Sequence, residues 1–369
     1  MTISSVELSD FRNYEKLLLH FDQGTNILYG DNAQGKTNIL EAIFLSCTTK
    51  SHRGAPDKEM IRFGKEEAHI RTVVEREQIP LRVDMHLRAA RGKGVAIDGV
   101  RMKRASAFLE KLQARIIFFS PEDLDIIKKS PAGRRRFLDI ELCQLDPLYL
   151  DALNAYQKAL ALRAKVLRDM IPGGDDTLLD IYDEQLIQNG KILIAARKKF
   201  VESLQEIAAH THETLTGNRE SIRVEYEPDC DDTFYEERFQ SARKKDIALR
   251  VTSCGPHRDE LGIYAQKEGE TEKQNVRKYG SQGQQRTAAL SLKLSEIELI
   301  KHKYGAKPVL LLDDVLSELD ENRQNHLLSL IGDIQTILTC TGVDAFVKSR
   351  MTINQMFHVT NGDVTEEKE

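Results

Sequence analysis

The stretch Gly30-Asp31-Asn32-Ala33-Gln34-Gly35-Lys36-Thr37 fits the phosphate-binding template GxxxxGK[ST]. It follows a short apolar segment, Thr25 to Tyr29, and precedes residues whose apolar positions recur at helical spacing. This order places the loop between a strand and a helix, where backbone N–H groups and the helix N-terminus converge on phosphate oxygens. Lys36 can reach the β- and γ-phosphates of a nucleotide, and the Thr37 hydroxyl can bind Mg2+. The sequence therefore predicts a nucleotide-binding protein.

A second motif, Val309 to Asp314, consists of four apolar residues followed by two carboxylates. Such a run predicts a buried strand that ends in acidic side chains at the carboxyl edge of a parallel sheet, as in a Walker B element. Asp313 would complete the Mg2+ shell through water, and Asp314 would orient the attacking water. The predicted catalytic residues are therefore Lys36, Asp313 and Asp314, and the predicted metal ligands are Thr37 and Asp313.

The composition limits the function classes. The 369 residues carry a net charge of -5, so any binding to nucleic acid must use local basic patches. No apolar run is long enough to span a membrane, and the five cysteines include no CxxC pair, which fits a reducing cytoplasm. One acid-free basic cluster is a candidate DNA-binding site, although a solvated surface face explains such charge equally well. Its residues are Lys128, Lys129, Arg134, Arg135 and Arg136.

The spacing of apolar residues divides the chain into regions. Short alternating segments predict strands up to about residue 120, and helical spacing dominates from 121 to 243. Strand-like pattern returns at Ile247 to Thr252 and Leu261 to Ala265, and helices and strands then alternate to Val359. The residues after Asp363 form a short acidic, low-complexity end. We therefore predict an α/β ATPase lobe of residues 1–120 and 244–369, and a compact helical arm lobe of residues 121–243.

A third motif, Ser281 to Arg286, precedes a helical pattern, so Ser281 and Gly283 are expected at a helix N-terminus, which is a second anion site. The motif resembles the signature of ABC-type ATPase heads, and Ser317 to Asp320 resembles their D-loop. This resemblance implies an ATP-dependent homodimer, in which the signature helix of one head contacts the γ-phosphate bound by the other. The implied residues are Ser281, Gly283 and Gln284 of the signature and Ser317 and Asp320 of the D-loop.

Seven motifs between residues 3 and about 361 resemble, in their order, the RecF family of bacterial recombination mediators, in the chromosome-maintenance branch of these ATPases. They are Gly30 to Asn38, Lys50 to Arg53, Phe119 to Leu124, Arg134 to Asp139, Gly255 to Asp259, Ser281 to Arg286 and Leu310 to Asp320. The resemblance implies a P-loop ABC-type head with a mixed sheet and an antiparallel β subdomain. It also implies that Arg12 and Asn13, in the N-terminal loop, approach ATP together with the phosphate loop and Asn38.

The function implied by this resemblance is that of a weak, DNA-stimulated ATPase that acts as a cytoplasmic molecular switch in recombinational repair and replication-gap processing. ATP and Mg2+ are the implied cofactors. The implied partners are duplex DNA and single-strand/duplex junctions, the RecR protein, a second copy of the chain and, indirectly, RecA, whose loading the protein assists. No membrane partner is expected.

Two features depart from the wider ABC pattern. Asp314 stands where many heads have glutamate, and no histidine follows the segment Thr336 to Thr341, which leaves Thr339 and Thr341 as candidate γ-phosphate sensors. An acid one methylene shorter places water less well, in keeping with slow hydrolysis. Two other functions share the phosphate loop. A transporter ATPase subunit gives no reason for the Arg134 cluster or the arm, and a P-loop phosphotransferase leaves the Ser281 motif unexplained.

Overall fold

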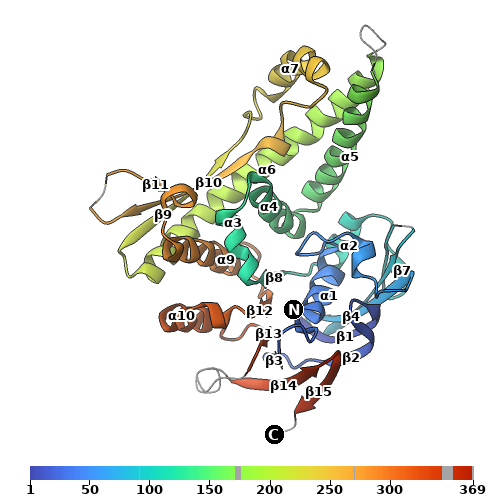
Figure 1. Ribbon diagram of the computed structural model, residues 1–369, viewed down its shortest axis with the longest axis vertical. Helices are drawn as coiled ribbons and strands as arrows, with labels where there is room; N and C mark the ends of the chain where they lie inside the picture. Colours follow the sequence, from blue (N-terminus) through green and yellow to red (C-terminus); the bar gives the residue numbers. More distant parts are fainter. Residues whose placement is uncertain (91, 171–175, 270, 343–351, 368–369) are drawn as a thin grey trace. The chain divides into compact units, whose positions relative to one another are not determined.

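The computed structural model describes residues 1–369 except 91, 171–175, 270, 343–351 and 368–369 (Figure 1). Two compact units are formed, one of Met1–Asp123 with Lys293–Glu369 and the other of Leu124–Leu292. The phosphate loop and the Walker B residues belong to the first unit, and the Ser281 motif belongs to the second. The predicted assignment of residues 1–120 and 244–369 to an ATPase lobe and of residues 121–243 to an arm lobe stays a prediction.

A six-stranded sheet in the first unit carries the phosphate loop, and its strand order is β15-β14-β3-β13-β12-β8. The bounds are β3 Thr25–Tyr29, β8 Ile116–Phe119, β12 Val309–Asp313, β13 Thr336–Cys340, β14 Ile353–Thr360 and β15 Asp363–Glu367. All of these pairs are parallel except β14 with β15. Every residue of β12 is buried, as expected for a central strand covered on both faces.

The loop-bearing strand β3 lies between β13 and β14, and α1 (Lys36–Thr48) begins directly after the loop. Helix α1 contacts β12 of this sheet and β4 of the second sheet, and nearly all of its residues are buried. The strand predicted at 25–29 and the alternation of helices and strands after residue 282 are confirmed. The acidic end after Asp363 is more ordered than its composition suggests, since it pairs with β14 as the edge strand β15.

The second sheet of this unit is antiparallel, with the strand order β2-β1-β4-β5-β6-β7. Its bounds are β1 Thr2–Phe11, β2 Tyr14–His20, β4 Glu67–Arg76, β5 Ile79–Arg88, β6 Gly94–Ile97 and β7 Val100–Arg101. The helical elements that lie wholly within the described part of this unit, apart from α1, are η1 Asp57–Met60, α2 Ala105–Leu112, η4 Leu316–Glu318 and α10 Glu321–Ile331. The predicted combination of a mixed sheet with an antiparallel β subdomain is therefore confirmed.

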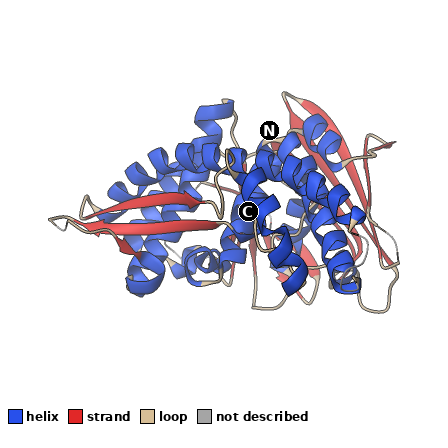
Figure 2. Cartoon of the chain, turned by 90° about the horizontal axis from the view of Figure 1, so that it is seen from above, coloured by secondary structure: helices blue, strands red, loops and turns tan. Residues whose placement is uncertain are grey.

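The second unit is built around two long helices, α5 (Pro147–Asp169) and α6 (Thr177–Thr216), which pack against each other. A three-stranded sheet accompanies them, and its long antiparallel pair, β9 and β10, is red in Figure 2. Its strands are β9 Glu220–Glu227, β10 Glu260–Lys267 and β11 Gln274–Asn275. The remaining elements are α3 Asp125–Lys128, α4 Pro131–Leu145, α7 Tyr235–Leu249, η3 Pro256–Arg258 and α8 Val276–Tyr279, while η2 (Pro121–Leu124) and α9 (Gln282–Tyr304) have residues in both units.

The strand predicted at Ile247 to Thr252 is wrong, because α7 continues to Leu249 and Arg250 ends it in the left-handed conformation. Tertiary contacts explain the difference. Asp246 of α7 is fully buried, where its carboxylate accepts a hydrogen bond from Arg163 at 2.8 Å and another from the backbone N–H of Ser253 at 3.0 Å. A buried carboxylate requires such partners, and the helix presents it to them.

Candidate nucleotide-binding site

The backbone of the phosphate loop depends on its two glycines. Gly30 and Gly35 both have positive φ, at 144° and 113°, which other residues rarely adopt. A Cβ at Gly30 would collide with the Val359 carbonyl oxygen, and one at Gly35 would collide with the Asn13 side chain. A side chain is therefore excluded at Gly30 by the backbone of Val359, and at Gly35 it is disfavoured by the positive φ together with the side chain of Asn13.

Lys36 is the first residue of α1, and its side chain folds back into the loop. The Nζ atom donates hydrogen bonds to the carbonyl oxygens of Gly30, at 2.6 Å, and Asp31, at 2.8 Å. The residue is only 4 % exposed. The ammonium group is thus held among the backbone groups of the loop, where an anion at the N-terminus of α1 would meet it.

Thr37 and Asp313 are 276 residues apart in sequence, and the fold joins them. The Thr37 hydroxyl donates to Asp313 Oδ1 at 2.7 Å, and the Thr339 hydroxyl donates to the same oxygen at 2.8 Å. A hydroxyl beside a carboxylate suits Mg2+, which prefers oxygen ligands and usually combines one or two protein groups with water and substrate phosphates. No cluster of three or more His, Cys, Asp or Glu in the described part of the chain could hold a metal by itself.

Asp314 directly follows β12 and has a positive φ of 52°. Its backbone N–H donates to the Thr339 hydroxyl at 3.0 Å, and Thr339 lies opposite Asp313 in the pairing of β12 with β13. Thr339 is 3 % exposed, and its hydroxyl links the backbone of one Walker B acid to the side chain of the other. It therefore fixes these two acids relative to each other, which leaves Thr341 as the candidate sensor at the end of β13.

We expect Asp314→Asn to lower the kcat of ATP hydrolysis by about 10²- to 10⁴-fold, because it removes the carboxylate predicted to orient the attacking water. The affinity for ATP should stay within about threefold of the wild type, since the predicted metal ligands Thr37 and Asp313 are unchanged. Single-turnover hydrolysis and ATP titration measure the two effects separately. The matched variant Asp313→Asn should weaken binding of ATP with Mg2+ as well. Near-normal turnover in Asp314→Asn would mean that another residue positions the water.

Asn13 connects the N-terminal loop to the phosphate loop. Its Nδ2 donates to the Gln34 carbonyl oxygen at 3.2 Å, and its Oδ1 accepts from Asn38 Nδ2 at 2.8 Å. The adjacent residue, Arg12, forms an ion pair with Glu41 of α1 at 2.9 Å. Asn13 therefore lies against the phosphate loop and Asn38, and Arg12 contacts the helix that follows the loop. That positions 12, 13 and 38 bind ATP stays a prediction.

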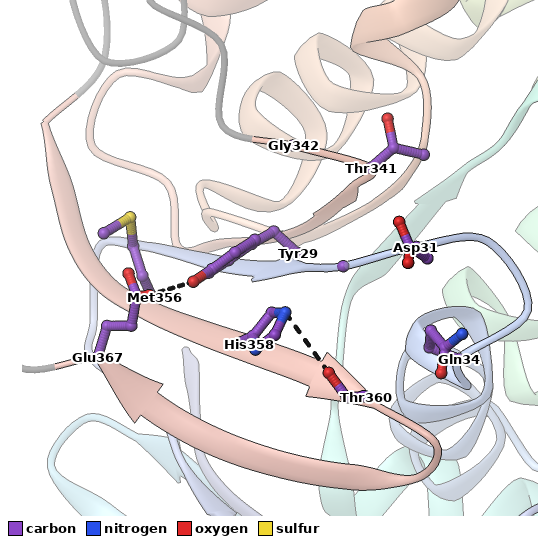
Figure 3. Close-up of a pocket in the computed structure, with 10 residues that line it drawn as sticks. Tyr29, Asp31, Gln34, Thr341, Gly342, Met356, His358, Thr360 and Glu367 are labelled. Atoms are coloured by element: carbon purple, nitrogen blue, oxygen red, sulfur yellow. Dashed lines mark hydrogen bonds between the residues drawn. The ribbon is translucent and has the colours of Figure 1, made fainter.

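A cavity of about 590 Å3 adjoins the loop at the carboxyl ends of β3, β13 and β14 (Figure 3). Its lining residues are Tyr29, Gly30, Asp31, Gln34, Thr341, Gly342, Met356, His358, Thr360 and Glu367. The rings of Tyr29 and His358 stack with centroids 5.0 Å apart. The turn between β14 and β15 also supports the loop, because the Asn361 N–H donates to Gln34 Oε1 at 2.5 Å. The strand that reaches Val359 was predicted and is present as β14, whereas β15 and its pairing with β14 were not predicted, because the acidic residues after Asp363 carry no strand pattern.

The signature residues adopt a reciprocal capping arrangement at the start of α9. The Ser281 N–H donates to Gln284 Oε1 at 2.8 Å, and the Gln284 N–H donates to Ser281 Oγ at 3.3 Å. Ser281 and Gly283 are exposed. In the D-loop, the Ser317 hydroxyl donates to the Asp314 carbonyl oxygen at 2.8 Å, and Asp320 caps α10 by accepting from the Arg323 N–H at 3.0 Å. The predicted helix N-terminus at the signature is therefore present and accessible.

The basic cluster is divided by the fold. Arg134 is 3 % exposed and pairs with both carboxylate oxygens of Glu260, and Arg135 donates to the Asp259 carbonyl oxygen. Arg134 therefore does not present its charge at the surface, because it satisfies a neighbouring acid inside the second unit. Arg136 is half-buried, while Lys128 and Lys129 are exposed. The DNA-binding prediction consequently falls on the two lysines, of which Lys129 also pairs with Asp125.

Comparisons with known proteins agree over nearly the whole chain. The family model described as "RecF/RecN/SMC N terminal domain" matches residues 2–365. The chain is 54 % identical to the "DNA replication and repair protein RecF" of Agathobacter rectalis, over 99 % of both chains. A solved structure described as the recombination mediator protein RecF with ATP in the RecFOR pathway is 31 % identical, with a TM-score of 0.87 over 99 % of this chain and 97 % of that one.

A solved Smc head bound to the C-terminal winged-helix domain of ScpA shares the fold, with a TM-score of 0.57 at 15 % identity, over 100 % of this chain and 97 % of that one. None of the described helices is long and apolar enough to cross a membrane.

Proposed function

The chain belongs to the RecF family of DNA replication and repair proteins, and on that premise we propose that it is an ATP-dependent DNA-binding protein whose ATPase acts as a switch. The observation that carries the proposal is the hydrogen bond between Thr37 and Asp313, which brings the phosphate loop and the Walker B strand into one site. A site made of a phosphate loop and a Walker B strand fits a nucleoside triphosphate bound to a divalent cation.

ATP binds with its phosphates on the loop N–H groups and the ammonium group of Lys36. Thr37 and Asp313 hold Mg2+, which neutralises phosphate charge when bound. The exposed signature of one copy then contacts the γ-phosphate bound by a second copy, so that ATP binding and dimerisation are one event. Asp314 orients water for slow hydrolysis, which separates the two copies. Lys36, Asp313 and Asp314 are thus the catalytic residues of this proposal.

In the cell, the ATP-bound dimer works in the cytoplasm on duplex DNA and on single-strand/duplex junctions at replication gaps. It cooperates there with RecR and assists the loading of RecA. The similarity to a protein of the RecFOR pathway supports this set of partners.

The DNA contact is best placed on a surface formed by α3 and α8, which touch each other in the second unit. Lys128 of α3 and Arg277 and Lys278 of α8 are exposed, and within the described residues no acidic side chain pairs with them. Cations without an acidic partner are available to replace the counterions of a DNA backbone. Because α8 ends only two residues before Ser281, this surface adjoins the signature in sequence.

We expect the wild type to bind gapped duplex DNA more tightly with ATP than without it. Lys128→Glu with Lys278→Glu should weaken that binding by about tenfold or more, and should flatten the slope of log affinity against log salt by about 2. The matched control is Lys158→Glu with Lys165→Glu, which makes the same charge change on exposed positions of α5. DNA titration over a salt series measures both quantities. Equal salt slopes in the two double variants would exclude the α3–α8 surface, and ATP-independent DNA binding by the wild type would contradict the switch.

A further inference from the structure

Arg12 is held by an acid that no predicted motif singled out. Its Nε and Nη2 atoms donate to the two carboxylate oxygens of Glu41 at 2.9 and 3.0 Å, and its Nη1 donates to the Glu59 carbonyl oxygen at 2.9 Å. This is the bidentate geometry in which a planar guanidinium matches a carboxylate. The orientation of the Arg12 side chain is therefore fixed at three points.

Glu41 lies on α1, one turn after the phosphate loop, and its side chain is fully buried. Oε1 also accepts a hydrogen bond from the Ser51 hydroxyl at 2.9 Å, and Ser51 is buried as well. Three segments meet at this carboxylate: the N-terminal loop, the helix that begins at the phosphate loop, and the Lys50 to Arg53 motif. The predicted function assigned no role to the Lys50 to Arg53 motif.

Burying the charged carboxylate of Glu41 costs free energy, because the group loses its hydration. The ion pair with Arg12 therefore adds little net stability, and its main effect is to fix the geometry of the Arg12 side chain. Arg12 has five N–H donors, of which these contacts use three, and its side chain is 21 % exposed. The next residue, Asn13, hydrogen bonds to the phosphate loop. The two remaining N–H donors of Arg12 are thus on a guanidinium group whose orientation is fixed, beside the site where we propose that phosphate binds.

We propose that Glu41, supported by Ser51, is a positioning residue that aims the guanidinium of Arg12 at the bound nucleotide. The inference rests on the proposed binding of ATP at the phosphate loop and on the predicted contact of Arg12 with it. Glu41 itself touches no nucleotide. Its contribution passes through Arg12, and this dependence is what an experiment can detect.

A double-mutant cycle with Arg12→Gln, Glu41→Gln and the variant carrying both changes tests the proposal by ATP titration. Each single change is expected to raise the Kd for ATP about tenfold, because each removes the charge-assisted contact that orients the guanidinium. The double variant should bind ATP no more weakly than Arg12→Gln, since Glu41 has nothing to position once Arg12 is gone. Ser51→Ala should raise the Kd about threefold and should have no further effect in the Arg12→Gln background.

Ser46→Ala is the matched control, because Ser46 is buried on the same helix and hydrogen bonds to Thr72 instead. It should bind ATP like the wild type. Thermal melting of every variant shows whether a change acts only on stability. If Glu41→Gln fails to fold, Ser51→Ala in the wild-type and in the Arg12→Gln background tests the same dependence on Arg12. Wild-type affinity in Glu41→Gln, or an additive loss in the double variant, would overturn the proposal. If the proposed function itself is wrong, the wild type will bind no ATP, and this result is distinct from a failure of the Glu41 proposal.

Discussion

Lys36→Ala is expected to raise the Kd for ATP by at least about 100-fold and to abolish measurable hydrolysis. The variant loses the fixed positive charge inside the phosphate loop, and with it the charge-assisted hydrogen bonds to phosphate oxygens, each of which contributes roughly 1.5–3 kcal/mol. Two such bonds correspond to about two to four orders of magnitude in affinity. Isothermal titration with ATP and Mg2+ measures the change directly.

The fold should survive this substitution. Among the described residues, the Lys36 side chain donates to just two groups, both carbonyl oxygens of its own loop, and alanine is a good helix former at the first position of α1. Circular dichroism and thermal melting check this point. Lys16→Ala removes a lysine from an exposed position of β2 and serves as the control. A Lys36→Ala protein that is folded and titrates with ATP like the wild type would remove the basis of the nucleotide-site assignment.

Ser281→Arg is expected to abolish ATP-dependent dimerisation while leaving ATP binding nearly intact. Ser281 is exposed at the N-terminus of α9, and a bulky side chain there would block the approach of a γ-phosphate bound by a second copy. Because dimerisation and DNA binding are linked in the proposed function, the ATP-dependent gain in DNA affinity should disappear as well. Sedimentation with and without ATP, each repeated with gapped duplex DNA, reports both effects.

Ser241→Arg is the matched control, since it makes the same change at an exposed position of α7. It should dimerise with ATP like the wild type. A Ser281→Arg protein that still forms the ATP dimer would show that the Ser281 motif is no signature in the ABC sense. The capping hydrogen bonds between Ser281 and Gln284 would then be its whole role.

The elements that sequence could predict are those whose signal is local. The phosphate loop needs glycines at positive φ, and the Walker B strand needs an unbroken apolar run, so both are visible within ten residues. Helix α7 was missed at its end because the burial of Asp246 depends on Arg163, which lies 83 residues away. Arg134 was misplaced for the same reason, because its partner Glu260 lies 126 residues away.

Within the site, the limit was again sequence distance. The predicted roles of Thr37 and Asp313 needed no contact information, but the link through Thr339 could be found only from the pairing of β12 with β13. Glu41 gave no signal, since an acid in a helix usually faces water. Charge and periodicity are local properties that can be taken from the sequence. The burial of a residue and its hydrogen-bond partners depend on segments that meet only in the folded chain.

The pairing of β3 has a consequence for how the protein is made. In the register of the sheet, Tyr29 lies opposite Cys340 of β13 and His358 of β14. A ribosome adds about 5–20 residues per second, so roughly 15–60 s separate the synthesis of the phosphate loop from that of its supporting strands. During this time β3 has two unpaired edges, which are templates for aggregation. A chain released before residue 353 would contain the complete phosphate-loop sequence but would lack the Val359 carbonyl oxygen that lies against Gly30 and the Asn361 N–H that donates to Gln34. We therefore expect the loop to reach its final geometry only after β14 has been made.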